Sequence, residues 1–180
     1  MDIILLFPNE FEVLRRKNNI PIDLFISSIA GAEAWLATGG KSGSAFMRSY
    51  NDLLVIKKIK KDEFMTFRKF LPKYFTHLHE GSLLNPIYGA FIIDRGMVSD
   101  YYIVMENLFF GMKDWHLYDF KGSVTRRFSR PPVIPLDINF IIDRFSEPIF
   151  CKDNVLQHLN ATVDYLCENN VIDYSLILVV

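Results

Sequence analysis

The sequence predicts an α+β fold with two lobes, in which an antiparallel sheet with flanking helices precedes a second lobe. Strand patterns separated by short turns occur in residues 35–59 and again in residues 84–105, with helical patterns around them. Strands that follow one another across short turns pair in the antiparallel sense. Residues 106–108 then connect this region to new strand and helix patterns. We therefore expect a first lobe over about residues 1–108 and a second lobe over about residues 109–180.

The composition is that of a folded protein without a strong charge of either sign. Half of the 180 residues are hydrophobic, and 16 Phe and 8 Tyr supply large side chains for a core. A net charge of −1 provides no general attraction to nucleic acid. Two cysteines without a histidine cluster indicate neither a zinc site nor a disulfide framework, which favours a cytoplasmic location. No apolar run has the length of a transmembrane segment, so a lipid substrate would be met at a membrane surface.

The N-terminal half contains both helical and strand patterns. The apolar run at residues 3–7 is too short for a signal peptide. Residues 10–36 have apolar side chains at helical spacing, and this helical region ends near Gly31. From residue 35 to residue 59 the pattern changes to three strands, joined by a glycine turn and by a turn at residues 50–52. This segment is expected to form a hairpin that carries a flexible loop.

A long helix is predicted to start at Lys61. Its apolar residues recur at helical spacing, and Pro72 predicts a kink or a new first turn. Two strands, residues 84–93 and 101–105, follow and are joined by a turn at residues 94–96. The second lobe is expected to contain a strand at residues 116–120, a loop at 129–132, a helix at 152–168 and a final strand at 172–180.

A glycine-rich loop is the first candidate for a phosphate contact. It comprises Gly39, Gly40, Lys41, Ser42 and Gly43. The glycines permit close approach of the backbone to a phosphate, while the lysine and serine add donors. The alternative is an ordinary hairpin turn, in which such residues are also common. A Walker P-loop would need a glycine where Trp35 stands and a helix after Ser42, where a strand is predicted.

Lys57 and Glu63 form a second candidate pair. Lys57 ends an apolar strand pattern, where burial of the ammonium would be costly unless an anion meets it. Glu63 begins the next helix, and a strand lysine paired with a helix glutamate holds nucleotide phosphates in kinase-like sites. The alternatives are a lysine that extends to solvent and a solvated glutamate at a helix start.

Charged residues at two further places could act on a phosphate. Asp119 and Lys121 alternate along a strand and therefore share a face, and Arg127 supplies a bidentate fork that suits a phosphomonoester. A surface ion pair at a strand end is the alternative. Asp173 precedes an apolar strand pattern, where a carboxylate could take the proton of an attacking hydroxyl. Its alternative is an aspartate that caps the turn after residues 169–170.

Together these segments resemble the catalytic core of phosphatidylinositol phosphate kinases. Residues 40–44 (GKSGS), 119–123 (DFKGS) and 172–176 (IDYSL) are similar to the glycine-rich loop and the two signature motifs of that family. Within the family the chain most resembles the phosphatidylinositol 3-phosphate 5-kinase branch. The resemblance covers almost the whole chain and is supported by residues 35–46, 73–75, 104–109, 136–137 and 139–140.

The resemblance implies an activity and a two-lobed fold distantly similar to protein kinases, with an antiparallel N-lobe over about residues 1–108 and a partial C-lobe over about residues 109–180. The implied reaction is ATP- and Mg²⁺-dependent phosphorylation of a phosphoinositide head group, with phosphatidylinositol 3-phosphate and its 5-hydroxyl as the expected target. Such a protein would lie peripherally on endosomal or other internal membranes. The implied catalytic residues are Asp173, Lys57 and Asp119, the implied lipid contacts are Lys121 and Arg127, and the implied nucleotide contacts are Gly39, Gly40, Lys41, Ser42, Gly43, Lys57, Glu63, Glu106 and Leu108.

The chain also departs from the pattern of the family. Phe120, Ile172 and Val179 are apolar changes within or beside the signature motifs, and Thr162 stands where many members carry an acid. The second metal-binding aspartate and the activation loop of the family would lie past Val180, so no metal ligand is assigned here. Residues 1–180 are therefore expected to be a catalytic-core segment that is inactive by itself. The alternative is a non-catalytic, kinase-like interaction module, which the coding sequence past Val180 would distinguish.

Overall fold

The computed structural model describes residues 1–35, 45–79, 82–112, 116–131, 133–143 and 153–179. The chain forms two compact units, Met1–Phe110 and Gly111–Val180. Each combines helices with antiparallel strands, which confirms the predicted α+β class.

The described part of the first unit contains a six-stranded sheet in the order β1-β5-β6-β4-β3-β2. Every neighbouring pair of strands is antiparallel. The strands are β1 (Asp2–Leu5), β2 (Glu33–Trp35), β3 (Phe46–Arg48), β4 (Leu54–Ile59), β5 (Ile87–Asp94) and β6 (Ser99–Glu106).

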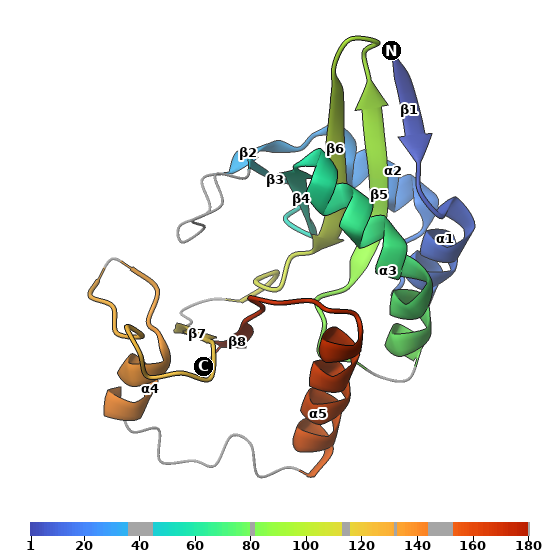
Figure 1. Cartoon of the computed structure of the whole chain (residues 1–180). Coiled ribbons are helices and arrows are strands. Elements are labelled where there is room, and N and C mark those ends of the chain that lie inside the picture. Colours follow the sequence, from blue (N-terminus) through green and yellow to red (C-terminus); the bar gives the residue numbers. More distant parts are fainter. Residues whose placement is uncertain (36–44, 80–81, 113–115, 132, 144–152, 180) are drawn as a thin grey trace. The chain divides into compact units, whose positions relative to one another are not determined.

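Helices cover both faces of this sheet. The helix α3 (Lys61–His79) crosses one face, and α1 (Pro8–Lys17) and α2 (Ile22–Ala30) lie against the other (Figure 1). Leu54, Val55 and Ile56 are buried in succession along β4. A strand that is covered on both faces requires such a continuous apolar run.

Ring contacts identify the two faces. The Tyr101 ring of β6 lies 5.1 Å from the Phe64 ring of α3, centroid to centroid. On the other face, Gly89 of β5 lies against the ring of Phe25 in α2.

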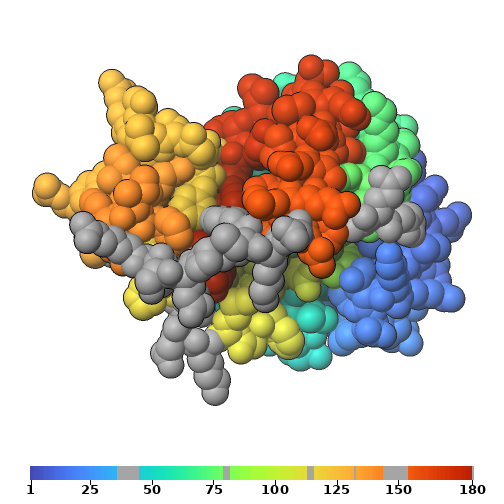
Figure 2. All heavy atoms as spheres, turned by 90° about the horizontal axis from the view of Figure 1, so that it is seen from below, coloured from blue at the N-terminus to red at the C-terminus, as the bar shows by residue number. Residues whose placement is uncertain are grey.

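The second unit is built on a two-stranded sheet. β7 (Leu117–Phe120) pairs antiparallel with β8 (Leu176–Val179), and the helices are α4 (Asp137–Asp143) and α5 (Asp153–Glu168). The rings of Tyr118 and Phe140 pack edge to face, with centroids 5.2 Å apart, and thereby join β7 to α4. The α5 helix contributes Tyr165 and Leu166 to the buried residues, while its outer side forms an exposed surface in orange and red (Figure 2).

Four features differ from the sequence predictions. The run at residues 3–7 contributes to β1, an edge strand that pairs with β5. The helix α4 was not anticipated, and α3 continues through Pro72, so of the two predicted alternatives the new first turn is wrong. The last strand begins at Leu176, so Asp173 precedes it and adopts a left-handed backbone conformation with φ 60°.

The contact between Gly89 and Phe25 generates a stability prediction. A Cβ atom placed on Gly89 would lie 2.9 Å from Cζ of Phe25, which is closer than carbon atoms approach in proteins. We expect Gly89→Ala to lower the free energy of unfolding by about 1–3 kcal/mol, measured by urea denaturation, because the core is overpacked.

A second substitution separates this contact from other causes. Phe25→Leu shortens the facing side chain and should relieve the clash in Gly89→Ala. The double mutant should therefore lose less unfolding free energy than the two single mutants lose together. Simple additivity would show that the Phe25 ring is not the cause.

Candidate functional site

The predicted glycine-rich loop cannot be placed. Residues 39–43 lie outside the described part of the chain. The strands on either side of it, β2 and β3, pair antiparallel, with Trp35 opposite Phe46.

Lys57 and Glu63 meet at the start of α3. Nζ of Lys57 donates to Oε1 of Glu63 over 3.0 Å. The lysine is 21% exposed, and the glutamate is 48% exposed. The two residues come together because α3 begins at Lys61, almost directly after β4 ends at Ile59. A partly buried ammonium is thereby neutralised on the face of the sheet that α3 crosses.

Glu106 lies on the opposite face from Lys57. Within β4 and β6, Lys57 is the register partner of Ile103, and Leu54 is the partner of Glu106. Side chains alternate along a strand, so an offset of three residues reverses the face. The side chains of Glu106 and Lys57 therefore point to opposite faces of the sheet.

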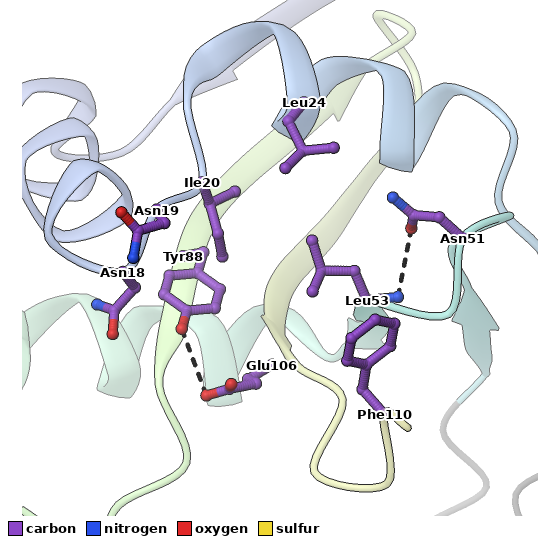
Figure 3. A pocket seen from close by; sticks show the side chains of 9 residues that line it. All are labelled: Asn18, Asn19, Ile20, Leu24, Asn51, Leu53, Tyr88, Glu106 and Phe110. Atoms are coloured by element: carbon purple, nitrogen blue, oxygen red, sulfur yellow. Dashed lines mark hydrogen bonds between the residues drawn. The ribbon is translucent and has the colours of Figure 1, made fainter. Parts of the chain in front are cut away.

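The side chain of Glu106 instead lines a hollow of about 390 Å³ on the α1 and α2 side (Figure 3). The hydroxyl of Tyr88 donates to Oε2 of Glu106 over 3.3 Å. Burial, followed by the charge and hydrogen bond of Glu106, raises the pKa of the Tyr88 hydroxyl, which therefore stays protonated. Leu108, the other connector residue assigned to the nucleotide, follows β6 and is 39% exposed.

In the second unit, Lys121 binds Asp173. Nζ of Lys121 donates to Oδ1 and to the main-chain oxygen of Asp173, both over 2.6 Å. The two signature motifs thus meet, although they are 52 residues apart in the chain. The Asp173 side chain is 86% exposed, and an ion pair so open to solvent adds little stability. The main effect of the contact is that Lys121 fixes the position of the Asp173 carboxylate.

Arg127 is held by two carboxylates of its own unit. Its Nε donates to Oδ2 of Asp137 over 2.7 Å, and its Nη2 donates to the main-chain oxygen of Asp119. Nη2 also lies 3.4 Å from Oδ1 of Asp119, a buried oxygen that makes no hydrogen bond among the described residues. The sequence assigned Arg127 to a lipid phosphate, whereas the structure shows contacts inside the unit.

Asp137 was not assigned a role from the sequence, although residues 136–137 supported the resemblance. Its side chain accepts from the amides of Lys121, Gly122 and Ser123 over 3.1, 2.9 and 3.3 Å, in addition to Arg127. Burial alone would raise the pKa of this carboxyl, but the hydrogen bonds from Arg127 and the backbone outweigh burial and lower the pKa below its ordinary value. Asp137 is therefore ionised at neutral pH.

The described residues do not form a metal site by themselves. Among them, no three His, Cys, Asp or Glu side chains gather closely enough to hold an ion. Within the same part of the chain, no helix has both the length and the hydropathy to cross a bilayer.

The fold and these contacts define a class of protein. An antiparallel sheet whose strand lysine pairs with a helix glutamate is the arrangement of kinase-like proteins. Residues 32–180 match the family described as Phosphatidylinositol-4-phosphate 5-Kinase. The chain belongs to this family.

Several curated relatives are similar over nearly the whole chain. The putative 1-phosphatidylinositol-3-phosphate 5-kinase FAB1C of Arabidopsis thaliana is 31% identical over 95% of this chain and 12% of the relative. The 1-phosphatidylinositol 3-phosphate 5-kinase FAB1 of Saccharomyces cerevisiae is 29% identical over 99% of this chain and 9% of the relative. Phosphatidylinositol 4-phosphate 5-kinase 7 of Arabidopsis thaliana is 30% identical over 95% and 24%. The chain thus spans between 9% and 24% of the length of these relatives.

The lowered pKa of Asp137 generates a prediction about acid stability. An ionised carboxylate with a depressed pKa stabilises the folded state fully above the unfolded pKa of about 3.9, and this contribution is lost as the pH falls towards the folded pKa. We expect Asp137→Asn to flatten the dependence of the unfolding free energy on pH below about pH 4. Denaturation at several pH values measures the slope. The exposed Asp164→Asn on α5 is the control, and an unchanged slope in Asp137→Asn would contradict the prediction.

Proposed function

We propose that this chain is a catalytic-core segment of an ATP-dependent phosphoinositide kinase. The expected reaction transfers the γ-phosphoryl group of ATP to the 5-hydroxyl of phosphatidylinositol 3-phosphate. The contact between Lys121 and Asp173 carries this proposal, because it joins the two signature motifs at one point. The names of the relatives from Arabidopsis thaliana and Saccharomyces cerevisiae support the substrate.

Asp173 is proposed as the base of the reaction. Its carboxylate would take the proton of the lipid hydroxyl while the hydroxyl oxygen bonds to the γ-phosphorus. The bond from the γ-phosphorus to the bridging oxygen breaks, and ADP leaves. Lys121 holds both the side chain and the main-chain oxygen of Asp173, and thus keeps this non-glycine residue in its left-handed conformation.

Lys57 is proposed to hold the phosphates of ATP. Its ammonium is positioned by Glu63 and lies on the α3 face of the sheet. Glycines 39, 40 and 43, with Lys41 and Ser42, remain proposed contacts of the same phosphates. Mg²⁺ would neutralise charge that develops on the phosphates.

The proposed place of action is a membrane surface. A phosphoinositide head group is presented there, and the described residues contain no helix that could span a bilayer. We propose a peripheral location on endosomal or other internal membranes, which follows from the proposed lipid. Localisation of a fluorescent fusion with and without depletion of phosphatidylinositol 3-phosphate tests this proposal.

The choice of lipid is tested by comparing substrates. Vesicles that contain phosphatidylinositol 3-phosphate or phosphatidylinositol 4-phosphate, with labelled ATP, measure the preference of the full natural protein. We expect faster labelling of the 3-phosphate. A preference for the 4-phosphate would contradict the proposed substrate and would favour the lipid in the name of the phosphatidylinositol 4-phosphate 5-kinase relative. ATP binding without labelling of either lipid would favour the non-catalytic module.

Substitution of the proposed catalytic residues should abolish turnover without unfolding the protein. We expect Asp173→Asn and Lys57→Ala each to lower kcat at least about a hundredfold, because each removes charge at the reacting centre. Lys58→Ala is the matched control, since Lys58 follows Lys57 on β4 but pairs with Asp100 on the other face. Near-normal turnover in Asp173→Asn or Lys57→Ala would show that its role is misassigned.

Arg127→Lys tests the proposed contact with the lipid phosphate. Lysine keeps the charge but loses the planar fork, so we expect activity on the lipid to fall about tenfold while nucleotide affinity holds. Arg130→Lys, in the same loop region, is the control. If Arg127 serves only Asp119 and Asp137, the mutant should lose stability without a change in the lipid concentration dependence.

A further inference from the structure

The turn at residues 121–123 is closed by a side chain that the proposed mechanism does not use. Three successive amides, those of Lys121, Gly122 and Ser123, point at the carboxylate of Asp137. Gly122 has φ 67°, a conformation that glycine adopts readily and that turns its amide inward with its neighbours. The turn is therefore a small cage of donors around one carboxylate.

The chemistry of this cage requires an anion with two oxygens. Oδ1 of Asp137 accepts from the amides of the turn, while Oδ2 accepts from Nε of Arg127 and, over 3.3 Å, from the amide of Lys121. A carboxylate has about four acceptor sites, which matches this set of donors, whereas an amide offers one oxygen and two donors of its own. Asp137 is 7% exposed, and its oxygens face donors of its own unit, so it is not placed to contact a substrate.

The cage connects directly to the proposed catalytic aspartate through Lys121. The main-chain nitrogen of Lys121 is bound by Asp137, and its Nζ is bound to Asp173. Lys121 is thus held at both ends. A lysine side chain has four rotatable bonds, so the position of its ammonium depends on a fixed backbone.

We propose that Asp137 is a positioning residue of the phosphoryl-transfer site, whose carboxylate sets the turn at residues 121–123 and thereby holds Lys121 against Asp173. This inference rests on the proposed function, because it assigns a role in the same site. Asp137 acts through Lys121 and touches neither the lipid nor ATP. Loss of its carboxylate should therefore impair turnover more than it impairs substrate binding.

A double-mutant cycle tests the path through Lys121. In the full natural protein we expect Asp137→Asn to lower kcat about tenfold or more, with the KM for ATP changed less than about twofold. In a Lys121→Ala background, the same substitution should lower kcat less than about threefold further, because the side chain that it positions is already gone. Equal losses in both backgrounds would mean that Asp137 only stabilises the unit, and would overturn the proposal.

Amide hydrogen exchange gives a readout that does not depend on activity. Asp137→Asn should speed exchange at residues 121–123, whereas Lys121→Ala should leave protection at Gly122 and Ser123 in place. Asp143→Asn is the matched control, since Asp143 ends the same helix and accepts from the hydroxyl of Tyr118 over 2.7 Å. Unchanged exchange in Asp137→Asn would overturn the proposal.

The double-mutant cycle and the hydrogen-exchange measurement together also distinguish failure of this inference from failure of the proposed function. If the wild-type protein phosphorylates no phosphoinositide, the proposed function fails, and with it the catalytic role of Asp137. Faster exchange in Asp137→Asn would then support only the part of the inference that concerns the turn. If Asp137→Asn does not fold, Asp137→Glu is used in both measurements: its longer side chain displaces the carboxylate from the amides of the turn, so exchange at residues 121–123 should still become faster, and unchanged exchange would overturn the proposal.

Discussion

The need to neutralise partly buried charge organises both units of this protein. In the first unit, the ammonium of Lys57 ends a buried strand and meets Glu63 in the first turn of the next helix. In the second unit, Arg127 and Asp137 are both largely withdrawn from solvent, and each would be costly to bury alone. The gain from such pairs is modest, but removal of one partner leaves an uncompensated charge. The positions of these side chains are therefore strongly constrained.

Local patterns predicted most elements, because helical and strand periodicity depends on nearby residues. Both N-terminal helices, the long helix at Lys61 and the central strands follow from that periodicity. The strand β1 could not be recognised in this way, since a short exposed strand exists only through its pairing with β5, about 90 residues later. The face of Glu106 depends on the register of β4 and β6, which the sequence does not reveal.

In the candidate site, too, contacts between residues close in the chain were predicted, whereas contacts between distant residues were not. Each signature motif was visible in the sequence, and the pairing of Lys57 with Glu63 was anticipated from a short spacing. Asp137 was not, because its amide donors lie 14 to 16 residues earlier and nothing in the local pattern marks a carboxylate as their acceptor. Similarly, the contact of Lys121 with Asp173 requires β7 and β8 to pair across most of the second unit.

The helix α3 connects two distant points of the sheet. Near its start Glu63 binds Lys57, and towards its end the hydroxyl of Tyr74 accepts from the amide of Ile87 at the beginning of β5. Pro72 lies between them and cannot donate to the carbonyl four residues earlier. The bending stiffness of a helix is lowest where a hydrogen bond is missing. Any bend in α3 is therefore expected close to Pro72 and Tyr74, well away from the first turn, which carries Glu63.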